Sequence, residues 1–257
     1  MTRRESVCDV SLCSCRQRRD IDPLELYASA IDTSDYVAAL APLVRRAVPE
    51  VGRLLDVGAG GGQLGAALAD PALPWTAIEP STMRARLGRL SPSPRVIANG
   101  WEAADLPTGG HDTVLAATMP AFFDHPEAFL ARCRGWARQS VVWVVPAHAG
   151  PRGLCFAGCL PREWHGEDET PGIDIVLAGL APSSRPHHAA SANWTFSGVV
   201  KDLDRLSAYL ADRLGWAARD PRRAELQRHL AAQARPDAAG ARLDIARKSA
   251  VLFWGNR

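Results

Sequence analysis

Four glycines, Gly58 and Gly60–Gly62, directly follow Asp56 in the segment RLLDVGAGGGQLGAALAD. Glycine has no Cβ, so such a cluster lets the backbone turn sharply and approach a ligand closely. The apolar run before the cluster is typical of a buried strand, and the Leu/Ala run after it is typical of a helix. Glu79 ends the next apolar run, within about 20 residues, where a carboxylate can accept both hydroxyls of a ribose. The loop is therefore predicted to hold a nucleoside-bearing cofactor.

Two classes of cofactor fit such a loop. Gly60, Gly62 and Gly65 formally satisfy the GxGxxG pattern of dinucleotide-binding folds, but this pattern begins three residues past Val57, too late for the tight turn. Asp56 would repel a pyrophosphate and attract the ammonium group of an amino acid. The chain also has only two lysines and no Tyr-x-x-x-Lys pair for hydride chemistry. A cofactor with an amino-acid moiety is favoured, and NAD(P) is the weaker interpretation.

Three segments resemble motifs of the class I S-adenosylmethionine-dependent methyltransferases: LLDVGAGGGQLGAALA, AIEPS and NGWEAADLPTGGHDTVLAATM. The resemblance covers roughly residues 53–147 well and the C-terminal third only in outline. It implies S-adenosyl-L-methionine as the cofactor. It also implies that the methionine moiety is surrounded by Asp56, Gly58, Ala59, Gly60 and Gly62.

The same resemblance places the rest of the cofactor. It implies that Glu79 holds the ribose and that Pro80 and Ser81 lie along the adenine. Many relatives have Gly-Asp-Ala where this chain has Gly100, Trp101 and Glu102. We expect Trp101 to pack on the adenine, with Glu102 as a polar partner; the alternative is that Trp101 only fills a groove between two helices.

The methyl acceptor is expected beside the sulfonium at the end of the fourth strand, at Thr118-Met119-Pro120, and Thr118 is also expected to contact the cofactor. Many amino-group methyltransferases carry Asn/Asp-Pro-Pro-aromatic there, and this chain has TMPA instead. That difference argues against nucleobase or glutamine N-methylation and leaves O, N, S or C atoms of small molecules as acceptors. If a base is needed, His165 is the first candidate, and other candidates in that region are His148, His187 and His188.

Apolar strand-like runs alternate with amphipathic helical runs between residues 53 and 146. Strands that are apolar throughout indicate a parallel sheet covered on both faces. We predict an α/β, doubly wound, mostly parallel seven-stranded sheet, the Rossmann-like methyltransferase fold, with an insertion before the sixth strand. Residues 1–20 are expected to form a flexible tail and 21–257 a single domain. Within this domain, residues 148–190, rich in Gly, Pro and His, should form an irregular insertion over the active site.

Composition narrows the class of protein. The 257 residues carry a formal net charge of +2, which does not indicate a nucleic-acid surface. There is no apolar run of about 18 residues and no secretory h-region, so we expect a cytoplasmic protein with no membrane partner. The six cysteines lack the spacings of common zinc sites, so no metal is expected. The oligomeric state stays undetermined.

The sequence thus predicts S-adenosylmethionine-dependent methyl transfer to a small-molecule substrate. Two alternatives keep the same pocket. One is a non-catalytic sensor or partner protein that binds S-adenosylmethionine, since the usual acceptor motif is absent. The other is transfer of the aminocarboxypropyl arm, which depends on which carbon of the sulfonium faces the acceptor.

Overall fold

A computed structural model describes residues 21–118 and 123–255 of the chain. The predicted tail, 1–20, and Met119-Pro120 of the expected acceptor segment lie outside the described residues. None of the described helices has the length and apolar character that crossing a membrane requires.

Within the described residues, one eight-stranded sheet organises the molecule, with seven strands in the order β3-β2-β1-β4-β5-β8-β6 and β7 paired with β8. Its strands are β1 (Leu54–Val57), β2 (Trp75–Ile78), β3 (Arg95–Ile97), β4 (His111–Ala117), β5 (Ala137–Pro146), β6 (His188–Val200), β7 (Arg235–Asp237) and β8 (Gly240–Gly255). The first five strands are parallel, and β8 runs antiparallel to both β5 and β6. Strand order reverses between β1 and β4, so the ends of these two strands border the crevice where doubly wound sheets bind ligands. The predicted doubly wound sheet, with its insertion before β6, is confirmed.

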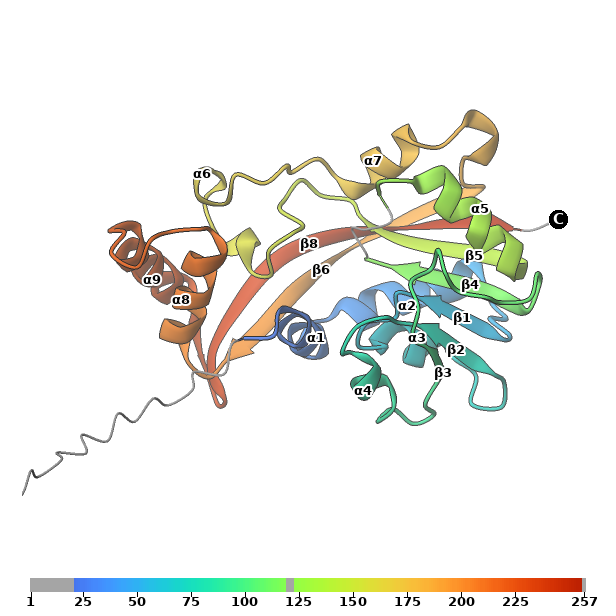
Figure 1. Ribbon diagram of the computed structural model, residues 1–257, viewed down its shortest axis with the longest axis horizontal. Helices are drawn as coiled ribbons and strands as arrows, with labels where there is room; N and C mark the ends of the chain where they lie inside the picture. Colours follow the sequence, from blue (N-terminus) through green and yellow to red (C-terminus); the bar gives the residue numbers. More distant parts are fainter. Residues whose placement is uncertain (1–20, 119–122, 256–257) are drawn as a thin grey trace, which may run out of the picture.

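Helices cover both faces of this sheet (Figure 1). The face covered by the N-terminal helices carries α1 (Pro23–Thr33), α2 (Tyr36–Ala47) and α3 (Gln63–Leu68), with α8 (Leu203–Arg213) and α9 (Arg222–Gln233) further along it. The opposite face carries α5 (Pro126–Trp136) and α7 (Gly172–Ala178), and the short α4 (Arg84–Leu87) follows β2. Alternate residues of β5 serve the two cores: Val142 and Val144 pack toward α2, and Trp143 packs toward α5.

The strands β6 and β8 form a long antiparallel pair that extends well beyond the parallel sheet (Figure 1). We call this pair the hairpin, although α8, α9 and β7 lie between its two strands in the sequence. β8 pairs with β5 only from Ser249 to Gly255, but with β6 from Ala241 to Phe253. Figure 1 shows α8 and α9 at the far end of this extension. The sequence predicts much shorter strands here, over 192–198 and 249–255. The strands are longer than predicted because the part beyond the parallel sheet is also buried on one face. There Trp194, Phe196 and Leu243 pack in the same core as residues of α1 and the insertion.

The segment between β5 and β6 contains four short helical elements and runs along the hairpin (Figure 1). They are η2 (Ala157–Cys159), α6 (Arg162–His165), α7 and η3 (Pro182–Ser184). Glu167 holds the start of this segment, because its carboxylate accepts hydrogen bonds from the backbone N–H groups of Arg152, Gly153 and Leu154. The loop at 150–156 thus has a defined shape without regular secondary structure.

Candidate functional site

The glycine loop after β1 has an alternating left-handed backbone. Gly58, Gly60 and Gly62 have φ of +67°, +56° and +76°, a region that residues with a Cβ rarely adopt. A Cβ on Gly62 would lie 2.6 Å from Leu87 Cδ2, so close packing requires this glycine. A Cβ on Gly60 would meet nothing nearer than the Gly58 carbonyl oxygen at 4.0 Å. The loop therefore packs tightly at Gly62 and leaves open space at Gly60.

Glu79 links the end of β2 to this loop. Its Oε2 accepts a hydrogen bond from the Gly60 N–H at 2.7 Å, and its Oε1 accepts one from the Ser81 N–H at 2.9 Å. The residue is 4% exposed. A carboxylate has about four lone-pair sites, so two remain for hydroxyl donors of a ligand. Glu79 both shapes the loop and keeps accepting capacity.

Asp56, the last acidic residue before the loop, is buried without a polar partner. It is 3% exposed, and within the part of the chain that the structure describes no hydrogen bond reaches its carboxylate. A Cβ on Gly65 would overlap the Asp56 carboxylate, so that glycine gives Asp56 its place against α3. Burial, with repulsion from Glu79 as the smaller cause, raises the pKa of Asp56 to about 7. Such a carboxylate favours the approach of a cation.

The residues expected around the adenine lie in two segments, one after β2 and one after β3. Pro80 and Glu102 are exposed, and Gly100 lies beside the Glu102 side chain. The ring of Trp101 is partly buried and meets the edge of Phe129 with 5.2 Å between centroids. Trp101 therefore has a packing contact to α5, as the alternative interpretation expects, whereas its contact with adenine stays a prediction.

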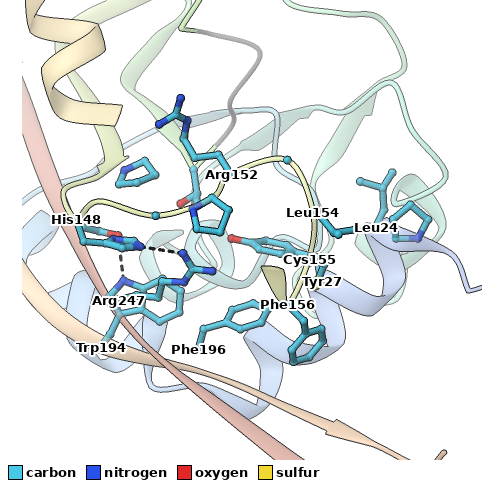
Figure 2. A pocket seen from close by; sticks show the side chains of 17 residues that line it. Leu24, Tyr27, His148, Arg152, Leu154, Cys155, Phe156, Trp194, Phe196 and Arg247 are labelled. Atoms are coloured by element: carbon cyan, nitrogen blue, oxygen red, sulfur yellow. Dashed lines mark hydrogen bonds between the residues drawn. The ribbon is translucent and has the colours of Figure 1, made fainter. Parts of the chain in front are cut away.

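A cavity of about 290 Å³ has Thr118, the residue that follows β4, in its lining; Figure 2 shows it from close by. Its main walls come from α1, β6, β8 and the start of the insertion. The lining includes Tyr27, Thr118, His148, Phe156, Trp194 and Arg247. Of the site residues that the sequence predicts, Thr118 and His148 line this cavity, whereas His165, His187 and His188 do not.

Two residues that line the cavity have a strained backbone. Thr118 and Phe156 are the non-glycine residues with left-handed φ in the described part of the chain, at +59° and +67°. A β-branched residue such as threonine is especially disfavoured there. Such strain clusters at functional sites, because the surrounding structure must hold it in place.

Tyr36 connects the cavity to the glycine loop. Its hydroxyl shares a hydrogen bond of 2.9 Å with Thr118 Oγ1, and its ring packs edge-on against Trp194 at 4.9 Å. Burial raises the pKa of Tyr36, and the nearby Asp56 carboxylate raises it further. One buried tyrosine thus contacts the Thr118 hydroxyl and lies near enough to the Asp56 carboxylate to feel its charge.

The structure places His165 away from the cavity. Its side chain is 1% exposed, its Nδ1 accepts a hydrogen bond from the Glu167 N–H at 3.1 Å, and Nε2 lies 3.5 Å from Glu169 Oε1. His165 thus helps to order the insertion. The cavity lining holds His148 instead.

The sequence analysis did not predict α1, a helix that contacts both the residue after the glycine loop and the cavity. Asp22 caps it by accepting from the Leu24 N–H at 2.9 Å, and Pro23 opens it, a signal that was present in the sequence. On one side, Gln63 donates to the Ala28 carbonyl at 3.0 Å. On the other side, Tyr27 lines the cavity.

Arg247, Phe156 and Trp194 were missed as site residues and carry no local sequence signal. They lie far apart along the chain: Trp194 and Arg247 meet because β6 pairs with β8, and the insertion packs Phe156 against Phe196 of β6. No three His, Cys, Asp or Glu side chains among the described residues gather as they would around a metal ion.

Comparison with known proteins identifies the fold. No protein-family model and no curated protein sequence matches the chain. A proposed type II methyltransferase from Anaeromyxobacter dehalogenans is similar in structure, with a TM-score of 0.51, 20% identity, and coverage of 84% of this chain and 94% of that one. A proposed methyltransferase from Bacillus halodurans gives a TM-score of 0.50, 13% identity, and coverage of 85% and 98%.

A third similar structure comes from work on the conversion of a disulfide bond into a thioacetal group during echinomycin biosynthesis. Its TM-score is 0.50 at 12% identity, with coverage of 86% of this chain and 84% of that one. Together with the strand order, these neighbours show that the chain has the class I methyltransferase fold.

Proposed function

We propose that this protein is an S-adenosylmethionine-dependent methyltransferase that acts on a small molecule. One observation carries the proposal: an open left-handed glycine loop lies between two buried carboxylates, Asp56 and Glu79, at the strand-order reversal of the sheet. The cavity lined by Thr118, which follows the strand paired with β1, is where an acceptor can enter.

The residues present fit this cofactor. The unpartnered Asp56 carboxylate suits the ammonium group of the methionine moiety, and Glu79 keeps two lone-pair sites for ribose hydroxyls. Gly60 leaves the space above the loop open. When bound, S-adenosylmethionine supplies an electrophilic methyl group on a sulfonium. By the same proposal Ala59 contributes to the loop, and Gly100, Trp101 and Pro80 border the adenine.

The acceptor would be held by the cavity. A volume of about 290 Å³ suits a small molecule rather than a macromolecular chain. The neighbour from work on echinomycin biosynthesis supports a small-molecule acceptor by analogy. Methyl transfer needs mainly two reactants held in line. We propose that Thr118, with its hydroxyl fixed by Tyr36, aligns the acceptor at this end of the cavity.

Calorimetry with S-adenosylhomocysteine tests the cofactor site. Asp56→Ala and Glu79→Ala variants that unfold cooperatively should lose measurable binding. Glu50→Ala, which changes an exposed carboxylate, should bind as the native chain does. Full affinity in both site variants would overturn the assignment.

A labelled-methyl assay separates catalysis from binding alone. The native chain, incubated with S-adenosylmethionine labelled in its methyl group and a small-molecule cell extract, should transfer label to a product. Cofactor binding without any transfer would instead favour the non-catalytic interpretation.

A further inference from the structure

Arg247 contributes a cation to the cavity, and no carboxylate of the described residues forms an ion pair with it. In residues 21–118 and 123–255, no carboxylate oxygen lies within 4.0 Å of its guanidinium nitrogens. The other lining arginine differs: Arg152 forms an ion pair of 3.0 Å with Asp168, and its guanidinium points out of the cavity (Figure 2). A buried cation is costly without a partner, so an anion in the cavity would stabilise Arg247.

Arg247 is held in place by His148 and by glycines. His148 Nε2 lies 2.8 Å from Arg247 Nη1. Arginine only donates hydrogen bonds, so Nε2 accepts, and the proton of the neutral ring lies on Nδ1, which donates to the Lys248 carbonyl at 3.0 Å. A Cβ on Gly158 would lie 2.9 Å from Arg247 Nη2, so the glycine leaves room for the guanidinium in its present position. One guanidinium donor is used, and the others remain for a ligand.

Aromatic rings form the apolar wall beside this cation. Tyr27 stacks on Phe196 with centroids 5.5 Å apart, and Phe156 meets the same ring edge-on at 5.4 Å. Trp194 continues the wall along β6. Arg247 lies over the Phe196 ring at 5.9 Å (Figure 2). Flat rings next to one cation suit a planar molecule with an anionic end.

Among the titratable groups near Arg247, Glu167 is the anion. Burial raises the pKa of Cys155 and of Cys159 to about 12, and it raises the pKa of Tyr27, so these three groups are neutral near pH 7. Burial lowers the pKa of His148. The Glu167 carboxylate favours the charged form of Arg247, but its oxygens bind three backbone N–H groups and form no ion pair with the guanidinium. The guanidinium of Arg247 therefore keeps donors for a ligand anion.

We propose that the methyl acceptor is a planar aromatic carboxylate, whose carboxylate pairs with Arg247 and whose ring lies against Trp194 and Phe196. This inference rests on the proposed function, because it names the acceptor class for that reaction. Arg247 is the residue that selects an acid over a neutral molecule of the same shape. His148 is a positioning residue that holds the guanidinium.

Calorimetry with two probes of matched shape, 2-naphthoate and 2-naphthamide, tests the charge preference. The native chain should bind the acid about tenfold or more tightly than the amide, as one charge-assisted hydrogen-bonded pair provides. Arg247→Gln should abolish this difference, and Arg247→Lys should retain part of it. Equal binding of the two probes by the native chain, or binding of neither, would overturn the proposal.

Two controls separate the possible failures. Arg152→Gln removes the arginine that faces away from the cavity, so the acid preference should persist; its loss there would contradict the assignment to Arg247. S-adenosylhomocysteine binding is measured on each preparation. Arg247→Gln should keep that binding, because Arg247 lies in the cavity and not in the glycine loop. Acid preference without S-adenosylhomocysteine binding would refute the proposed function and keep the anion site, and the reverse would refute the anion site alone.

Discussion

The glycine loop and the aromatic cavity lie on the same face of the sheet, but the chain builds them differently. The loop comes from one continuous segment after β1, with Glu79 added from the neighbouring strand. The cavity takes residues from α1, the end of β4, the insertion, β6 and β8. The loop depends on local backbone conformation, whereas the cavity depends on tertiary packing. This difference decides which mutations act on stability, on cofactor affinity or on acceptor affinity.

A glycine of the loop and a glycine outside both regions should differ in their tolerance of a side chain. Gly62→Ala forces a left-handed alanine and places its Cβ 2.6 Å from Leu87 Cδ2, which we expect to cost about 2–5 kcal/mol. Gly215, between α8 and α9, has φ +73° and open space, so Gly215→Ala should cost only about 1–2 kcal/mol. Urea unfolding of both variants measures the difference. Equal losses would mean that close packing adds nothing at Gly62.

Asp56 should make cofactor affinity depend on pH. Its pKa in the free protein is about 7, and a bound ammonium group favours the ionised form. Affinity for S-adenosylhomocysteine should therefore fall by up to about tenfold per pH unit as pH drops below 7, and level off above it. Calorimetry between about pH 5.5 and about pH 8 checks this. A flat profile would show that Asp56 does not contact the ammonium group.

The same carboxylate should limit stability in the free protein. The pKa of Asp56 is about 7 in the folded protein and 3.8 in the unfolded chain, so folding favours the protonated carboxyl. The free energy of unfolding is therefore unaffected by this group below pH 3.8 and falls as the pH rises from 3.8 toward 7. Asp56→Asn keeps the neutral form at every pH. We expect it to stabilise the protein by about 1–3 kcal/mol at about pH 8 and by less at about pH 5. Thermal unfolding that shows no gain at the higher pH would contradict this.

The smallest effect is expected where α1 joins the two regions. Gln63→Ala removes hydrogen bonds to the Ala28 carbonyl and to Asp32, at 3.0 and 2.8 Å. The loss should be about 1 kcal/mol, and amide exchange should speed up in α1 rather than in α8. Gln227→Ala, which removes a bond to Asp204, is the matched control in the hairpin region. Unchanged exchange in α1 would show that Gln63 does not hold this helix.

The same contrast explains what the sequence predicts and what it does not. The parallel strands were predictable because β1 and β2 are mainly apolar, with Asp56 and Thr76 as exceptions, and are followed by Gly58 and Glu79, which identify the strand ends. The segment RRAELQRHLAAQ likewise predicts a helix over 222–233, the range that α9 occupies. The strand-end positions of Asp56 and Glu79 followed from spacing alone, and their roles toward a cofactor stay predictions.

The cavity was not predictable, because its residues have no shared sequence pattern. Arg247 looks like any exposed strand arginine until β6, η2 and α1 are packed around it. The expectation of His165 as a base relied only on its presence in the insertion. This segment has no regular periodicity, so the sequence does not predict which of its side chains face the cavity. His148, from the same insertion, lines the cavity because Lys248 and Arg247 bind both of its ring nitrogens.

The central claim is that the open space at Gly60 is the seat of a cofactor, and a pair of alanine variants tests it most directly. Gly60→Ala and Gly109→Ala introduce the same strain, since φ is +56° and +61° and neither Cβ meets a protein atom closer than 4.0 Å. Both should unfold at similar urea concentrations. Gly60→Ala should lower the affinity for S-adenosylhomocysteine at least about tenfold, as a Cβ intruding on a bound ligand would. Gly109→Ala should bind as the native chain does, and equal affinity in the two variants would contradict the claim.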